Sequence, residues 1–161
     1  PPGRRLAGKI KPSLFHFVMK ANAMPSTAAD IYRQHIVVAE ADLDEMRHVN
    51  NVRYLQWLQD GAILHWQQLA DEALRTQYAW VARHHSLDYL AAAWLGDELL
   101  LETWVDECRG ALSTRHYRLS RLSDKQTVVQ AHTQWCLLNR SSLKPVRIPA
   151  AVAALFRHRE G

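Results

Sequence analysis

The chain has 161 residues and a mass of 18.5 kDa, with 48% hydrophobic and 22% charged residues. One domain of this length can bury a substantial core, and the composition excludes a disordered or fibrous protein. The formal net charge of +4 at pH 7 raises nucleic acid as a partner, so the distribution of the charge matters.

The excess of basic residues lies in the first 29 residues, which hold five Lys and Arg and no Asp or Glu. The rest of the chain carries 15 Lys and Arg against 16 Asp and Glu, a net charge of −1, which argues against nucleic-acid binding. We expect residues 1–29 to be a tail, either a tag or translated upstream sequence ahead of a natural start at Met24, with a mitochondrial transit peptide as the alternative. Residues 30–161 are then expected to form a single domain.

Membrane insertion and disulfide bonding are not expected. No apolar run approaches the length of a membrane span. The spacing of Cys108 and Cys136 matches no disulfide framework, zinc site or redox motif. We expect two buried or half-buried thiols in a reducing cytoplasm.

The first predicted elements are a strand over residues 31–40 and, after a polar turn, a helix over residues 52–74. Polar residues of the helix recur at helical spacing along one narrow stripe, and the rest of its surface is apolar. This pattern predicts a helix buried on several sides. Gly61 costs about 1 kcal/mol of helix propensity, and we expect it to let another backbone approach closely.

After the helix the hydrophobic period changes from about 3.6 to 2 residues, which predicts strands. A short last helix is expected over residues 150–159, with Pro149 at its first position. One long helix and four consecutive strands predict an α+β protein in which a curved antiparallel sheet wraps around one long central helix. Open sheet edges favour self-association. The predicted strands after the helix cover residues 78–90, 97–108, 112–122 and 127–138.

The stretch ADLDEMRHVNN, residues 41–51, joins the first strand to the helix and combines acids, a histidine and amides. A carboxylate can act as a base toward water or as a nucleophile, and free N–H groups at a helix start can stabilise an oxyanion. Asp44, His48 and the backbone N–H of Asn51 could supply these parts. The alternative is plain capping, with Asn50 or Asn51 as the N-cap and the acids favoured by the helix dipole.

The run DLDEMRHVNNVRYLQWL, residues 42–58, resembles the signature of hotdog-fold acyl thioesterases. This family includes 4-hydroxybenzoyl-CoA thioesterase-like proteins, bacterial long-chain acyl-CoA thioesterases and plant acyl-ACP thioesterases. HHSLDYLAAAWLGDELLLETWV, residues 84–105, and the ending TQWCLLN…KPVRIP resemble its later blocks. The resemblance covers residues 31–156 and implies the hotdog fold.

The resemblance also implies roles for single residues. Asp44 matches the family's catalytic carboxylate, which attacks the thioester or activates water. Asn51 matches the position whose backbone N–H polarises the thioester oxygen, and His48 matches a histidine implicated in catalysis. Asn50 lies in the same motif and Tyr54 matches an aromatic residue of the first helical turn, so both are candidate substrate contacts. No metal or cofactor is implied.

Two basic residues are further candidates for substrate binding. Arg115 and Arg140 lie in and after late strands and could contact the phosphates of CoA, with ordinary solvated bases as the alternative. One departure from the family concerns Met46, because plant enzymes have Asn two residues after the aspartate. This departure favours the simpler bacterial acyl-CoA mechanism.

The resemblance implies an acyl-CoA substrate and a site at a dimer interface, so a homodimer or a dimer of dimers (homotetramer) is expected. A hotdog enoyl-CoA hydratase or dehydratase is one alternative, but its motif has Asn directly after the aspartate, then Pro and then His. Here Glu45 follows Asp44. A non-catalytic, regulatory acyl-CoA-binding protein is the other alternative, against which the presence of Asp44 speaks.

Overall fold

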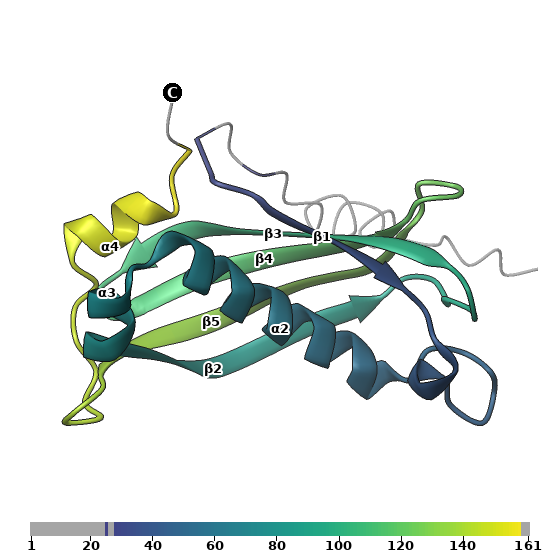
Figure 1. Cartoon of the computed structure of the whole chain (residues 1–161), viewed down its shortest axis with the longest axis horizontal. Helices are drawn as coiled ribbons and strands as arrows, with labels where there is room; N and C mark the ends of the chain where they lie inside the picture. Colours follow the sequence, from purple (N-terminus) through teal and green to yellow (C-terminus); the bar gives the residue numbers. More distant parts are fainter. Residues whose placement is uncertain (1–24, 26–27, 159–161) are drawn as a thin grey trace, which may run out of the picture.

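The computed structural model describes residue 25 and residues 28–158, so most of the expected N-terminal tail lies outside the described residues. A five-stranded sheet carries one long helix across one of its faces (Figure 1). The elements are β1 (Tyr32–Val37), the 3₁₀ turn η1 (Glu40–Asp42), α2 (Asn51–Leu69), α3 (Glu72–Gln77), β2 (Tyr78–Tyr89), β3 (Glu98–Arg109), β4 (Leu112–Arg121), β5 (Thr127–Asn139) and α4 (Ala150–Leu155).

The sheet is antiparallel throughout and has the strand order β1-β3-β4-β5-β2. Its strands twist around α2, as Figure 1 shows. The predicted α+β class, with a curved antiparallel sheet around one long helix, is therefore confirmed. β1 and β2 are the two edges of the sheet, because each of them pairs with only one strand.

The helix α2 buries one face rather than several, so that part of the prediction was wrong for the single chain. The sheet covers only one side of the helix, and apolar side chains on the other side stay open: Val52 is 74% exposed and Ile63 is 50% exposed. The residues of the buried face recur at intervals of three and four, as expected of a helix on a sheet. They are Tyr54, Trp57, Leu58, Gly61, Ala62 and His65.

The predicted helix over residues 52–74 is in fact two helices. α2 ends at Leu69, and Ala70 adopts an extended conformation. Asp71 then caps α3, because its Oδ1 accepts a hydrogen bond from the Leu74 amide at 2.9 Å. A smaller correction concerns the last helix, where Pro149 is the N-cap and not the first helical residue.

Gly61 does allow a close approach, but by a side chain and not by a backbone. A Cβ atom at this position would lie 2.6 Å from Cδ2 of Leu101, a fully buried residue of β3. The glycine therefore lets α2 settle onto the centre of the sheet, and its cost in helix propensity is offset by this packing.

The two ends of the described chain pair with each other. Ala29 forms an antiparallel bridge with Arg157, and the Asp30 amide donates to the Phe156 carbonyl at 2.9 Å. Beyond the bridge, the His158 amide donates to the carbonyl of Ala28 at 2.6 Å. The end segments thus form a short ladder beside the sheet.

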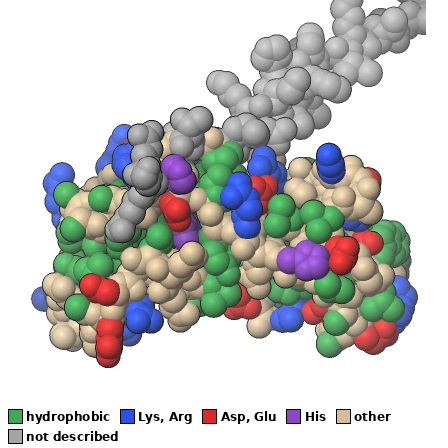
Figure 2. All heavy atoms as spheres, turned by 45° about the horizontal axis from the view of Figure 1, so that its top comes forward, with side chains coloured by type: hydrophobic (Ala, Val, Ile, Leu, Met, Phe, Trp, Pro, Cys, Tyr) green, Lys and Arg blue, Asp and Glu red, His purple; other side chains and the backbone are tan. Residues whose placement is uncertain are grey.

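The two cysteines have the burial that was expected of them. Cys136 is buried and Cys108 is half-buried, and both are free thiols. Among the described helices, none is both long and apolar enough to cross a membrane. On the face in Figure 2, side chains of both charges alternate with apolar ones and no large basic patch is visible.

Candidate active site

The loop between β1 and α2 folds back on itself as a narrow hairpin. Leu43 bridges Val49, and the Asp44 amide donates to the His48 carbonyl at 2.7 Å. Arg47 at the tip has a φ of 64°, a left-handed conformation that closes the turn. Asp44 therefore lies at the base of a tight hairpin whose backbone pairing fixes its position.

The Asp44 carboxylate is oriented by one of its two oxygens. Oδ1 accepts hydrogen bonds from the amides of Met46, at 2.9 Å, and His48, at 3.2 Å. Oδ2 has no hydrogen-bond partner within the described residues. The half-buried side chain is thus held in place by the loop while one oxygen stays free to act as a base or a nucleophile.

Asp42, the other acid of the DLD run, has a purely structural role. It is buried; its Oδ1 accepts from Nε of Arg53 at 2.6 Å and its Oδ2 from the amide of Ala39 at 2.8 Å. Its carbonyl accepts from the Asn50 amide at 2.9 Å. These bonds fix the loop against the start of α2, so that Asp44 has a defined position relative to the helix.

The helix start resolves which asparagine is the cap. Asn50 is the N-cap, because its Oδ1 accepts from the Val52 amide at 3.0 Å and its carbonyl accepts from the Arg53 amide at 2.9 Å. The Asn51 N–H finds no acceptor among the residues that the structure describes. This exposed amide points out of the positive end of the helix dipole, where an anionic oxygen is favoured.

His48 lies beside Asp44 without forming a dyad with it. Its ring packs edge-on against Trp94, with 4.3 Å between ring centroids and 90° between planes. In the described part of the chain, no hydrogen bond joins its ring nitrogens to the Asp44 carboxylate; the link between the two residues is through the backbone. Trp94, which the sequence did not single out, therefore fixes the histidine ring.

Tyr54 packs beneath the loop and is buried. Burial raises the pKa of its hydroxyl, and a hydrogen bond with the Ala93 backbone opposes that change, so the phenol stays neutral at ordinary pH. Its ring lies 5.8 Å from that of Tyr89 at the end of β2. The Tyr89 hydroxyl donates to the Asn51 carbonyl at 3.4 Å, which places the end of β2 beside the start of α2.

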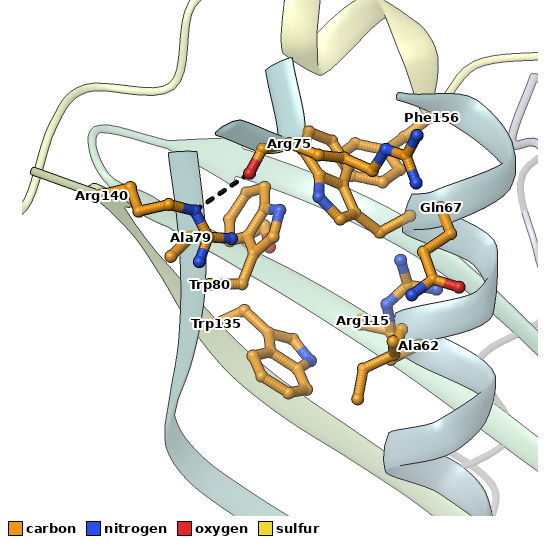
Figure 3. A pocket seen from close by; sticks show the side chains of 12 residues that line it. Ala62, Gln67, Arg75, Ala79, Trp80, Arg115, Trp135, Arg140 and Phe156 are labelled. Atoms are coloured by element: carbon orange, nitrogen blue, oxygen red, sulfur yellow. Dashed lines mark hydrogen bonds between the residues drawn. The ribbon is translucent and has the colours of Figure 1, made fainter. Parts of the chain in front are cut away.

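A cavity of about 520 Å³ opens at the other end of α2 (Figure 3). It lies between α2, the start of β2 and the inner face of the sheet, and its walls are mainly apolar, with four aromatic side chains among them. Both basic residues that were singled out as substrate contacts, Arg115 and Arg140, line it. The full lining is Ala62, Ile63, Trp66, Gln67, Arg75, Ala79, Trp80, Ser113, Arg115, Trp135, Arg140 and Phe156.

Arg115 is not a solvated base, so that alternative was wrong for this residue: the side chain is only 4% exposed. Its Nη1 donates to Nδ1 of His65 at 2.9 Å and to Oγ1 of Thr103 at 3.1 Å. Arg140 lies at the exposed mouth, where it donates to the carbonyls of Arg75 and Tyr78. Contact of either arginine with CoA phosphates stays a prediction.

His65 completes the buried polar chain behind the cavity. Its ring is fully buried, and Nε2 lies 2.7 Å from Oδ2 of Asp30. Burial, and next the positive charge of Arg115, lower its pKa to about 4, although Asp30 acts in the opposite direction. The imidazole is therefore neutral at pH 7, with Nδ1 free to accept from Arg115 and Nε2–H donating to Asp30.

The sequence analysis missed His65 and Asp30. The available signal for His65 was a polar residue inside the apolar face of the predicted helix, four residues from Gly61 and three from Ala62. Asp30 carried no local signal, because its role depends on the pairing of the two chain ends. Within the described residues, no group of three or more His, Cys, Asp or Glu could hold a metal ion.

The predicted site residues fall into two groups at opposite ends of α2. The Asp44 loop adjoins Asn51, whereas the cavity begins near Ala62 and extends past Trp66. Fifteen residues of helix separate Asn51 from Trp66, which corresponds to about 22 Å. One chain therefore does not bring the carboxylate and the cavity together.

Comparisons with known proteins bear on this arrangement. A family model described as the Thioesterase-like superfamily matches residues 38–156, well over half of the chain. The acyl-CoA thioesterase YbgC of Haemophilus influenzae is 34% identical over 82 residues, which are 51% of this chain and 59% of that protein. The match thus spans less than two thirds of that relative's length.

Solved structures share the fold. Slr0204, a 1,4-dihydroxy-2-naphthoyl-CoA thioesterase from Synechocystis, superimposes with a TM-score of 0.69 at 18% identity, covering 79% of this chain and 96% of that one. The protein SAV2348 from Staphylococcus aureus, solved in complex with CoA, gives a TM-score of 0.71 at 12% identity and covers 82% and 85%. At these identities the likeness concerns the fold alone.

Proposed function

The chain belongs to the thioesterase-like superfamily, and from this membership we propose that it hydrolyses acyl-CoA thioesters to a free acid and CoA. The observation that carries the proposal is a pair of groups at the start of α2: the Asp44 carboxylate, one oxygen of which has no partner among the described residues, and the Asn51 amide, which has no acceptor among them. Such a pair combines a base or nucleophile with a donor for the oxyanion. The matched relative YbgC, an acyl-CoA thioesterase, supports the same class of substrate.

In the simplest scheme Asp44 acts as a general base. Its free oxygen takes a proton from water while the water oxygen adds to the thioester carbon. The carbonyl oxygen becomes negative and accepts a hydrogen bond from the Asn51 N–H. The tetrahedral intermediate then collapses, the C–S bond breaks, and the CoA thiolate leaves and receives the proton from Asp44. Direct attack by Asp44, through an anhydride that water hydrolyses, uses the same groups.

We assign the surrounding residues positioning roles. His48, held by Trp94, flanks the carbonyl, and the Asn50 cap keeps the Asn51 amide pointing outward. Tyr54 supports the loop from below. Because the carboxylate depends on loop amides for its orientation, small movements of the loop should cost activity.

The proposal includes a homodimer formed through β2. β2 has twelve residues against six in the other edge strand, β1, and it leaves an open edge with exposed Val81 and Tyr89. The start of β2 lines the cavity, and its end lies beside Asn51. A two-fold, antiparallel pairing of β2 with its copy would set the cavity of one chain opposite the Asp44 loop of the other.

The substitution Asp44→Asn tests the proposal. We expect kcat for release of free thiol from a panel of acyl-CoAs to fall about 100- to 10,000-fold, because the base is lost while the loop acceptor is kept. Glu45→Gln, a neighbouring exposed acid, is the matched control and should leave kcat unchanged.

Two results would contradict the proposal. One is an Asp44→Asn protein with wild-type melting temperature and undiminished thiol release. The other is a wild-type protein that releases thiol from no member of a panel of short, long and aromatic acyl-CoAs. The latter is the behaviour of a hydratase or of a binding protein without turnover.

A further inference from the structure

The cavity at the far end of α2 is strongly positive. Its lining includes Arg115 at the floor and Arg75 and Arg140 at the mouth, but no Asp or Glu. Among the described residues, none of these arginines forms an ion pair; their hydrogen-bond partners are carbonyls, a hydroxyl and a neutral imidazole. A concave site lined by one sign of charge attracts ligands of the opposite sign.

Arg115 presents donors to this cavity. Its Nη1 is occupied by His65 and Thr103, whereas its Nε and Nη2 have no partner in the described part of the chain. Those two atoms are also not enclosed, because the only fully buried side-chain atoms without a partner among the described residues are Gln34 Oε1 and His116 Nε2. Since Arg115 is part of the cavity lining (Figure 3), we infer that these N–H groups reach the cavity.

The guanidinium lacks a direct counter-ion although it is buried. The nearest carboxylate in its polar chain, that of Asp30, lies behind the neutral ring of His65. A buried charge is costly unless it is paired and hydrogen-bonded, and arginine does not escape this cost by losing its proton. An oxyanion in the cavity would complete a bidentate contact with Nε and Nη2.

The other walls of the cavity indicate the chemistry of the main part of the ligand. Trp66 and Trp80 meet edge to face at 5.7 Å, Phe156 packs against both, and Trp135 faces α2 across the open space (Figure 3). These walls fit a hydrocarbon chain or an aromatic ring and not a hydrated diphosphate. The lining therefore fits a ligand that has an apolar body and an anionic end.

We propose that Arg115 is a specificity-determining residue that binds a carboxylate at the far end of the acyl group, so that the preferred substrates are ω-carboxyacyl-CoA thioesters. In this arrangement the carboxylate reaches the floor of the cavity, the apolar body lies between the tryptophans, and the thioester stays at the mouth. The inference rests on the proposed function and on the pairing through β2, which brings the Asp44 loop of the second copy to that mouth.

The experiment compares pairs of acyl-CoAs of equal chain length, one ending in a carboxylate and the other in a methyl group. We expect a higher kcat/KM for the carboxylated member. Arg115→Gln keeps a donor for His65 but removes the charge, and should lower kcat/KM for the carboxylated member about 10- to 100-fold while the methyl member changes little. Arg115→Lys should restore part of the preference.

The outcomes separate the rival roles of this arginine. A preference for the methyl member in the wild type, or no effect of Arg115→Gln, would overturn the inference. An equal loss for both members in a folded variant would also overturn it, because it would place Arg115 on the CoA moiety or in the scaffold. In that case esters of CoA lacking the 3′-phosphate would show whether a phosphate is the group bound.

A binding measurement distinguishes failure of this inference from failure of the proposed function. Thioether analogues of the same CoA pairs cannot be hydrolysed, and quenching of the cavity tryptophans reports their binding. If no thioester is hydrolysed but the carboxylated analogue binds at least ten-fold more tightly and loses this advantage in Arg115→Gln, the cavity assignment stands alone. Equal binding of both analogues would overturn it whatever the activity.

Discussion

At the scale of single residues, environment separates side chains that look alike in the sequence. Asp42 and Asp44 lie two positions apart in one motif, yet both oxygens of Asp42 are saturated by donors and one oxygen of Asp44 is free. A saturated carboxylate stabilises a loop, and a carboxylate with a free oxygen can take a proton. The same contrast separates two backbone N–H groups. That of Asn50 donates to the Asp42 carbonyl, whereas that of Asn51 has no acceptor among the described residues.

His65 predicts a pH dependence of stability. Its pKa in the folded chain is about 4, below the ordinary value of 6.5, so the unfolded state binds the extra proton first as pH falls. The free energy of unfolding should therefore decline by about 3 kcal/mol between pH 6.5 and 4 and change no further from this source below that range. Above pH 6.5 the contribution is fully present.

Urea titrations at a series of pH values measure this effect. The matched control is His65→Gln, which can still accept from Arg115 and donate to Asp30 but does not titrate. The free energy of unfolding of this variant should not show the decline due to His65. Only the pH dependence that both proteins owe to their carboxylates should remain. Parallel curves for the two proteins would show that folding does not lower the pKa of His65, which would contradict a neutral, buried imidazole.

At this scale the sequence could predict which groups lie together only where those groups are neighbours along the chain. The helix cap, its neighbouring amide and the loop acid lie within a few residues of one another, so the motif places them together. Arg115 and His65 meet only because strand register and helix rotation turn both toward one interior. No local pattern contains that information, and the solvated alternative for Arg115 was wrong for this reason.

At the scale of elements, the strands were placed within one to three residues of their observed ends. Their alternation and turn residues are explicit, and Gly110 and Lys125 adopt the left-handed conformations expected of such turns. The end of α2 was missed because the apolar pattern continues through Ala70 and Leu74. What ends the helix is the competing cap at Asp71, a signal that the continuous pattern concealed.

The contact between α2 and β3 predicts a steric conflict at Gly61. Gly61→Ala gains helix propensity of about 1 kcal/mol, but its methyl group would meet the buried Leu101 side chain. Because Leu101 is enclosed, overpacking should outweigh the gain and lower the free energy of unfolding by about 1–3 kcal/mol net.

A double-mutant cycle with Leu101→Val checks this interpretation. The valine lacks the Cδ2 atom that approaches Gly61, so the combined variant should be clearly more stable than the sum of the two single changes predicts. Strict additivity in chemical denaturation would mean that the helix moves as a whole to accept the methyl group.

At the scale of the whole molecule, the fold class could be read from the order of elements, whereas the cavity could not. Its lining comes from α2, α3, β2, β4, β5, the loop after β5 and the segment after α4, and only the folded sheet with α2 across it brings these parts together. The dimer was expected from the family resemblance. The order of the predicted elements in one chain indicated only that the open edges of the sheet favour self-association.

The composite site predicts complementation between inactive variants. Asp44→Asn removes the base, and Ala79→Trp fills the cavity of the same chain. When the two variants are co-expressed, a mixed dimer should contain one site with an intact Asp44 from one chain and an open cavity from the other. Random mixing should restore about a quarter of wild-type thiol release.

Purification through a different tag on each variant isolates the mixed dimer, and each homodimer serves as its control. Light scattering establishes that all three species have the same mass. Activity no higher than that of the two homodimers would mean that Asp44 and the cavity of the same chain act together, contrary to the proposed pairing through β2.

The ladder between the two chain ends has a thermodynamic consequence for the molecule. Asp30 anchors the polar chain behind Arg115, and Phe156 forms part of the cavity wall, so residues more than a hundred positions apart meet around one ligand space. Any molecule that binds there selects the state in which both ends are docked. Ligand binding in the cavity and docking of these two segments are therefore linked equilibria: a ligand bound there should stabilise the pairing of residues 28–30 with residues 156–158, and weakening that pairing should lower the affinity for the ligand.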